Sequence, residues 1–207
     1  MDRETIDRMG TAVGEPPVRG MTLQETRALT TRDGLTLLAR RLTEADGRAL
    51  QDFNRGLDPE SERWFRAHAY DDATVRKALA RSCAGDDFTL GVFDGDRMVG
   101  YFFLWYFREP VPLLGIGLQD DYQGRGLGRQ MMALLVDAAK AARKDGVELT
   151  TNMGNDRAFA LYRRAGFRHY GDVAAVQGDG SVLTEHGMYY AIKPGSTPPA
   201  REHRPPV

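Results

Sequence analysis

The chain has 207 residues and a mass of 23.0 kDa, which fits one domain that buries its core without a disulfide or a structural metal. Hydrophobic residues make up 42% and charged residues 28%, as in water-soluble globular proteins. The formal net charge of −1 argues against a general nucleic-acid-binding protein, which carries a basic excess.

Three further features concern the compartment. Cys83 is the single cysteine, so no intramolecular disulfide can form, in keeping with a reducing compartment. The charged N-terminus lacks the apolar stretch of a signal peptide. The longest nearly apolar run, 98–107, is too short for a membrane-spanning helix. We therefore expect a soluble, cytoplasmic protein without a membrane partner.

The two flanks differ in composition from the rest. Residues 1–33 are polar and broken by glycine and proline, which predicts a flexible N-terminal arm. Residues 194–207 hold five of the ten prolines, which predicts a disordered tail. Residues 34–193 contain neither a repeat nor a linker and should form one domain.

The first part of this domain reads as a strand followed by helices. Residues 35–42 form the expected strand, and Thr43 has the features of a helix N-cap. Asp58 and Pro59 suit the N-cap and first position of a second helix. Asp72 begins a short third helix in this interpretation.

A sheet-forming region follows. Residues 88–93 and 98–107 predict a hairpin around a tight turn. The second strand is apolar or aromatic on both faces, so helices should cover both sides of the sheet. Residues 113–118 predict another strand, and its glycines, Gly115 and Gly117, indicate a bulge or a close approach by a ligand or another backbone.

The remaining elements alternate in type. Apolar spacing predicts a helix over 126–143, a strand over 147–151 and a helix from Asn155 to residue 165. Residues 168–177 and 182–192 predict a closing hairpin. The order predicts an α/β (α+β) fold with a central mixed sheet and helices on both faces.

The glycine-rich segment 122–129 lies between a strand and a helix. Its three alternating glycines allow backbone N–H groups to converge on an anion, and the helix N-terminus adds partial positive charge. Arg125 and Arg129 can add charge-assisted contacts to phosphate. The segment is a candidate pyrophosphate site, with a plain flexible turn as the alternative.

Two nucleotide-binding motifs are excluded. No Gly-x-x-x-x-Gly-Lys run followed by Ser or Thr is present, so the segment is not a P-loop. A dinucleotide fingerprint needs a third glycine, and Arg129 or Met131 occupies its place in the two possible alignments.

A second motif narrows the interpretation. It consists of Asn155, Ala158, Leu161, Tyr162, Gly166 and Phe167. Together with Gln123, Gly126 and Gly128 of the first segment, it resembles the two motifs of the GNAT family of acetyl-CoA-dependent N-acyltransferases. The resemblance covers residues 34–192, and it implies a mostly antiparallel GNAT-like sheet.

The resemblance also implies roles for individual residues. The backbone of Ile116, Gly117 and Leu118 would pair with the pantetheine arm of acetyl-CoA. The pyrophosphate would be held by Gln123, Gly124, Arg125, Gly126, Leu127, Gly128 and Arg129. Asn155 would hydrogen-bond the cofactor between splayed elements, and Tyr162 would be the general acid.

The chemistry is consistent with those roles. An amine attacks the thioester carbonyl directly, and a backbone N–H near Leu118 can stabilise the tetrahedral oxyanion. Tyr162, with an ordinary pKa of about 10, can protonate the departing thiolate. This route needs no covalent enzyme intermediate and no metal. Cys83 is interpreted as a core residue rather than a nucleophile, because no His lies in a partnering motif.

Alternatives remain for the two residues of the second motif. Tyr162 could be a core aromatic on a short helix, and Asn155 could be a plain N-cap. In some family members an acidic residue on the preceding strand is the general base, but Thr150 occupies that position here. The unranked candidates for the base are Glu148, Asp120, Asp121, His169 and Glu185.

The sequence therefore predicts an N-acetyltransferase that moves the acetyl group of acetyl-CoA to a primary amine of a small molecule, as a monomer or homodimer. One alternative acceptor is a protein N-terminus or lysine. Another alternative is a non-catalytic CoA-binding sensor or interaction domain.

Overall fold

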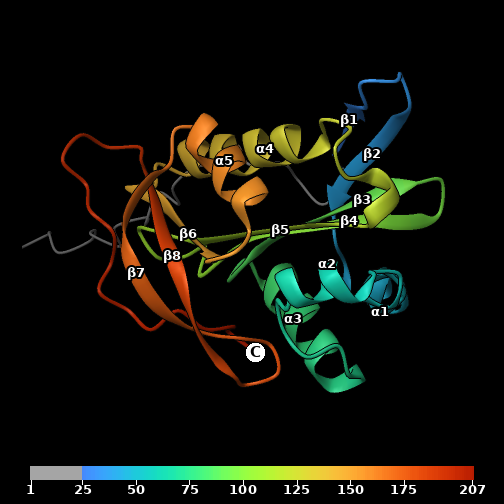
Figure 1. The fold of residues 1–207 in the computed structure, drawn as a ribbon. Coiled ribbons are helices and arrows are strands. Elements are labelled where there is room, and N and C mark those ends of the chain that lie inside the picture. Colours follow the sequence, from blue (N-terminus) through green and yellow to red (C-terminus); the bar gives the residue numbers. More distant parts are fainter. Residues whose placement is uncertain (1–24) are drawn as a thin grey trace, which may run out of the picture.

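A central twisted sheet organises the protein in the computed structural model, which describes residues 25–207 (Figure 1). Within that range the sheet has eight strands in the order β1-β2-β3-β4-β5-β6-β8-β7. The strands are β1 Thr26–Thr30, β2 Thr36–Arg41, β3 Phe88–Asp94, β4 Arg97–Trp105, β5 Leu113–Leu118, β6 Gly146–Asn152, β7 Arg168–Val176 and β8 Val182–Ala191. Neighbouring strands are antiparallel except β5 and β6, so the predicted mixed, mostly antiparallel sheet is confirmed.

Helices cover both faces of this sheet. The helices are α1 Gly47–Arg55, α2 Pro59–Trp64, α3 Asp72–Ala84, α4 Leu127–Ala141 and α5 Asp156–Arg164, with short 3₁₀ turns at Glu44–Asp46 and Asp120–Tyr122. Figure 1 shows α4 and α5 on one face and α1, α2 and α3 on the other. Strand β4 contributes to both cores: Phe102 and Leu104 pack on the α4 side, and Phe103 and Trp105 on the α1 side. The prediction of a strand buried on both faces is thus confirmed.

The predicted helix starts depend on side-chain caps. The Asp58 carboxylate accepts a hydrogen bond from the Ser61 N–H, with Pro59 at the first helical position. Helix α3 begins at Asp72, as expected, and Asp71 caps it by accepting bonds from the N–H groups of Ala73 and Thr74.

The sequence predicted a flexible arm over residues 1–33, but the structure is ordered at the C-terminal end of this range. Residues 26–30 form β1, which pairs with β2 through a tight turn at Gly34, a residue with φ of +90°. Leu29 is the one buried residue of β1 and packs against the α4 core. The strand therefore lacks the alternation of apolar and polar residues by which a strand is recognised in a sequence. Residues 1–24 of the expected arm lie outside the described residues.

The expectation of a disordered tail also differs from the structure. The C-terminal segment runs beside β7, where the Val176 N–H donates to the carbonyl of His203 over 2.7 Å. Arg201 and His203 contact the fully buried Glu148 of β6 at 2.9 and 2.8 Å. A buried carboxylate needs such partners, so the segment completes the domain.

The two glycines of β5 make room for aromatic rings, rather than for the bulge, ligand or backbone that the sequence suggested. A Cβ atom on Gly115 would collide with the ring of Phe103, and one on Gly117 would collide with the ring of Phe65. Both rings pack on the α1 side of the sheet. The close approach is therefore made by aromatic side chains of this chain.

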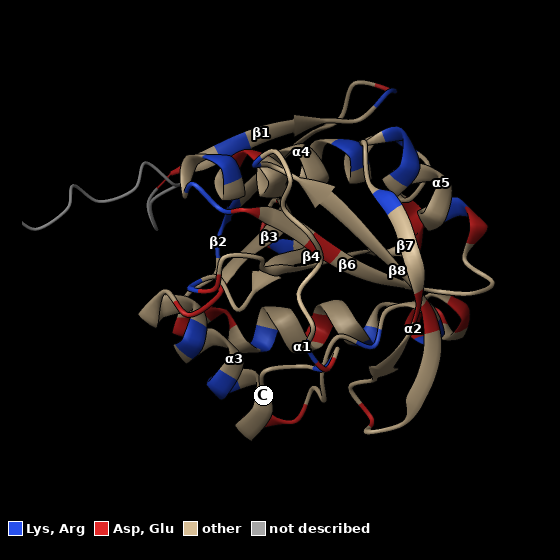
Figure 2. Ribbon diagram, turned by 90° about the vertical axis from the view of Figure 1, so that its left-hand side faces the viewer, with Lys and Arg blue, Asp and Glu red and all other residues tan. Residues whose placement is uncertain are grey.

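Charged residues of both signs are interspersed along the helices in the view of Figure 2, in keeping with the small net charge. Within residues 25–207, no helix combines the length and the apolar character needed to cross a membrane.

The contacts of Glu148 predict a stability effect. Burial alone would raise the pKa of Glu148, but hydrogen bonds from His203 and Tyr170 outweigh it and lower the pKa. In Glu148→Gln, Arg201 and His203 lose their charged partner, and we expect the free energy of unfolding at neutral pH to fall by about 3 kcal/mol. Urea unfolding of both proteins measures this difference.

The pH dependence has a definite sign. Because the folded-state pKa is lowered, the stabilisation by Glu148 is present above the ordinary glutamate pKa and is lost as pH falls through the folded-state value. The difference in the free energy of unfolding between wild type and Glu148→Gln should therefore become smaller at acidic pH. Glu202→Gln, which removes an exposed carboxylate paired with Arg204, is the control and should cost less than about 1 kcal/mol. Equal stability of wild type and Glu148→Gln would show that the buried network contributes little.

Candidate functional site

Strands β5 and β6 diverge, and the divergence opens a cleft. Their parallel pairing is limited to Leu113 opposite Glu148, so the edge of β5 facing β6 is unpaired from residue 114 onward. A cleft of about 1350 Å³ lies at this gap. It is lined by all the predicted site residues except Arg125 and Leu127. Free backbone groups along a strand edge can pair with an extended ligand.

The glycine-rich segment bends sharply before α4. Gly124 and Gly126 have φ values of +74° and +91°, a region that favours glycine. Gly128 lies in the first turn of α4, where a Cβ atom would come within 3.3 Å of the Leu161 side chain. The glycines therefore allow both the turn and the close packing of α4 against α5.

The N-terminus of α4 fits an anionic group. Gly126 occupies the N-cap position, and no side chain caps the helix. The N–H groups of its first turn thus keep their hydrogen-bonding capacity and the partial positive charge of the helix end. This donor set suits a pyrophosphate, which supports the predicted place of the CoA phosphates.

The arginines around this loop do not all lie as the sequence predicted. Arg125 turns away from the cleft and forms an ion pair with Asp33, with its Nε donating over 3.0 Å. Arg129 lines the cleft. Arg32, from the turn between β1 and β2, also lines it and lies beside Gly126. Sequence reasoning missed Arg32, because it placed this turn in the flexible arm.

Gln123 is held by protein partners. Its side-chain amide donates to Ser61 Oγ over 2.9 Å and to the Leu118 carbonyl over 3.1 Å. Its Oε1 accepts from Arg157 Nη1 over 3.1 Å. The residue therefore ties α2, β5 and α5 around the loop, which makes it a positioning residue. Leu127 similarly contributes a fully buried side chain to the core.

Asn155 combines two features. Its Oδ1 accepts from the Ala158 N–H over 3.0 Å, so the N-cap interpretation is confirmed. Its NH₂ group lines the cleft and has no hydrogen bond to any other described residue. The cap therefore leaves two donors free for a ligand.

Tyr162 is a core aromatic with an accessible end. Its side chain is 8% exposed and packs on Phe167, yet it also lines the cleft. Burial, reinforced by the nearby Glu185 carboxylate, raises the pKa of Tyr162 to about 12. The phenol thus stays protonated near neutral pH, as a proton donor requires.

The candidate bases separate clearly in space. Glu148 is sealed by the C-terminal segment, and His169 and Asp121 do not line the cleft. Asp120 lines it, but its oxygens accept from Ser61 Oγ and from the Asp58 N–H. Glu185 lines it, is 4% exposed and accepts from Gln177 Nε2.

Four further segments line the cleft. Trp64 of α2 and Trp105 of β4 supply aromatic surface, and Gln177, just after β7, supplies an amide. His203 and Arg204 of the C-terminal segment also line it. No pattern in the proline-rich tail indicated that it would border the site.

Comparison with known proteins agrees with this geometry. A model of the acetyltransferase (GNAT) family matches residues 50–167, which is more than half of the chain. The chain belongs to the GNAT acetyltransferase family. The resemblance seen in the sequence is thus confirmed.

Two relatives in sequence are informative. N-alpha-acetyltransferase RimI of Mycobacterium tuberculosis is 35% identical over 86 residues, or 40% of this chain and 52% of RimI. A mycothiol acetyltransferase of Clavibacter michiganensis is 28% identical over 167 residues, or 80% of this chain and 49% of that enzyme. The chain thus spans about half the length of these curated GNAT relatives.

A solved GNAT structure shares the fold. RimJ of Mycobacterium smegmatis, in complex with CoA-disulfide, superposes with a TM-score of 0.66. The match covers 81% of this chain and 87% of RimJ at 16% identity, so it concerns the fold alone.

The phosphate site gives a direct prediction. Gly126→Glu places a carboxylate at the helix end, and repulsion should remove the rise in melting temperature that acetyl-CoA causes by mass action. Differential scanning fluorimetry with and without acetyl-CoA measures it. Gly95→Glu is the matched control, because Gly95 also has positive φ but lies in the β3–β4 turn with open space around it. An equal rise in melting temperature with acetyl-CoA in both variants would show that the loop does not bind the phosphates.

Proposed function

We propose that this protein transfers an acetyl group from acetyl-CoA to a primary amine by direct attack through a tetrahedral intermediate. The observation that carries the proposal is one cleft with an uncapped helix N-terminus at one side and the Tyr162 hydroxyl in its wall. A thioester whose diphosphate is held by α4 can extend along the free edge of β5 toward Tyr162. Acetyl-CoA supplies the activated acetyl group.

Binding of acetyl-CoA falls to backbone groups in this proposal. Ile116 and Leu118 offer backbone N–H groups on the unpaired edge of β5, whereas the backbone of Gly117 faces its partner Tyr101 on β4. The first turn of α4 and Arg129 hold the diphosphate, and Arg32 takes the charge-neutralising place expected of Arg125. The free NH₂ group of Asn155 donates to the cofactor from the opposite side of the gap.

Proton movement involves two side chains. Tyr162 donates its proton to the departing thiolate, and its raised pKa keeps the proton available. Glu185 accepts the proton of the attacking amine, directly or through water. Of the two lining carboxylates among the candidate bases, Glu185 has fewer oxygens committed to hydrogen bonds.

A small amine is the proposed acceptor. The C-terminal segment, α2 and the residue after β7 line the cleft, and the aromatic surface of Trp64 suits a compact cation. The match to a mycothiol acetyltransferase over most of this chain supports a metabolite. The match to RimI favours a protein N-terminus as the second candidate.

An acceptor panel separates the two candidates. Release of free thiol from acetyl-CoA is followed with small amines, aminosugars and lysine derivatives on one side and peptides with free N-termini on the other. We expect turnover with members of the first group. Turnover restricted to peptides would establish the second candidate. Binding of acetyl-CoA without turnover in either group would support a non-catalytic sensor.

The role of Tyr162 has its own test. Tyr162→Phe should lower kcat by about 10² to 10⁴, the range for one positioned acid, with little change in KM for acetyl-CoA. The wild-type rate should show no loss from Tyr162 ionisation until pH approaches its pKa of about 12. Steady-state kinetics across pH provide both measurements.

The control removes a comparable hydroxyl elsewhere. Tyr189 has a buried hydroxyl without a partner among the described residues and does not line the cleft. Tyr189→Phe should therefore leave kcat unchanged. An unchanged kcat in Tyr162→Phe would reduce Tyr162 to a core aromatic.

A further inference from the structure

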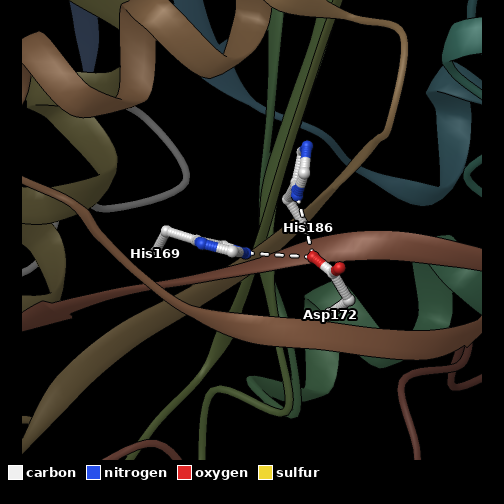
Figure 3. Close-up of side chains that lie close together, drawn as sticks. All are labelled: His169, Asp172 and His186. Atoms are coloured by element: carbon white, nitrogen blue, oxygen red, sulfur yellow. Dashed lines mark hydrogen bonds and ion pairs between the residues drawn. The ribbon is translucent and has the colours of Figure 1, made fainter.

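Three potential metal ligands meet on the α5 face of the β7–β8 hairpin. They are His169 and Asp172 of β7 and His186 of β8 (Figure 3). One ligand atom from each residue lies within 4.8 Å of the others. None of the three lines the acetyl-transfer cleft, so the proposed catalysis does not explain this arrangement.

A bulge in β7 brings these residues together. In a regular strand His169 and Asp172, three positions apart, would point to opposite faces. The pairing with β8 shifts between His169 and Gly171, so Tyr170 is an extra residue that reverses the alternation. Asp172 lies directly opposite His186, and His169 lies opposite Met188, two residues further along β8. All three side chains therefore share one face.

The distances approach those of a coordinated ion. Asp172 Oδ1 is 3.1 Å from His169 Nε2 and 2.9 Å from His186 Nδ1, and Figure 3 shows the carboxylate between the two rings. Ligand atoms of a tetrahedral Zn²⁺ site with bonds of about 2.0 to 2.2 Å lie about 3.3 to 3.6 Å apart. A small outward movement of each side chain would thus admit an ion.

The surroundings suit such an ion. Phe159 of α5 packs against both imidazoles, with ring centroids 5.9 Å from His169 and 4.9 Å from His186, and forms an apolar wall. The imidazoles meet nearly perpendicular, at 87°. The ligand side chains are 21 to 47% exposed, so an ion can enter and water can complete its coordination.

We propose that His169, Asp172 and His186 form a binding site for a divalent transition metal of the zinc type, which fastens β7 to β8 beneath α5. Two imidazoles and one carboxylate are ligands that Zn²⁺, Co²⁺ and Ni²⁺ accept, whereas Ca²⁺ and Mg²⁺ require oxygen-rich sites. The role is structural, because the site lies outside the cleft. It does not depend on the proposed acetyl transfer.

Metal titration of the tag-free full chain tests the proposal. Cys83 is exposed, in contrast to the core position predicted from the sequence. Cys83→Ser is therefore used as the parent, because the Cys83 thiol could bind the same ions. Isothermal titration with Zn²⁺ should show one bound equivalent, and Zn²⁺ should raise the melting temperature. The visible absorption of Co²⁺ should report coordination by nitrogen and oxygen.

Single-ligand variants decide the location. His169→Gln and His186→Gln should each weaken Zn²⁺ binding by at least about 10- to 100-fold, since loss of even an outer partner has that effect. Asp172→Asn should act in the same direction. Asp96→Asn, an exposed carboxylate in the β3–β4 turn, is the control and should bind like the parent.

Two results would overturn the proposal. One is the absence of stoichiometric binding of Zn²⁺, Co²⁺ and Ni²⁺ at millimolar concentration, which would leave a hydrogen-bonded His–Asp–His group only. The other is unchanged Zn²⁺ affinity in either histidine variant. Ca²⁺ and Mg²⁺ serve as negative controls. A rise in melting temperature with these ions equal to that with Zn²⁺ would contradict the proposed ligand chemistry.

Discussion

The divergence of β5 from β6 is the constraint on which the site depends. Pairing restricted to Leu113 and Glu148 leaves the far half of β5 with free backbone groups and places α4 and α5 on either side of the gap. If the two strands stayed paired, no ligand could reach the N-terminus of α4 and the Tyr162 hydroxyl together. Glu148 stands where the strands part, and its buried ion pairs hold the C-terminal segment at that point.

Local signals account for how far the sequence predicted the fold. Apolar spacing, the caps at Asp58 and Asn155 and the turn at Gly95 are encoded within a few residues, and the corresponding elements were predicted. Strand β1 and the C-terminal segment were missed, because each is fixed by distant partners. Leu29 meets the α4 core, and His203 meets Glu148, contacts that no periodicity records.

The candidate site shows the same division. Gly126 and Asn155 were indicated by motif spacing, and the structure brings both to the cleft. The positions of Arg125 and Gln123 depend on which partner each side chain reaches, Asp33 in one case and Ser61 in the other. The His169–Asp172–His186 group was invisible in the sequence, because a bulge alters which residues share a face.

Gly115 and Gly117 have a consequence for the surroundings of the proposed reaction. The rings of Phe103 and Phe65 cover one face of β5, while its pairing with β4 occupies one edge. Water is thereby kept from two sides of the strand, so that less water competes for an N–H on the remaining edge when it donates to developing charge. Two residues without side chains thus admit the aromatic cover next to the proposed acetyl site.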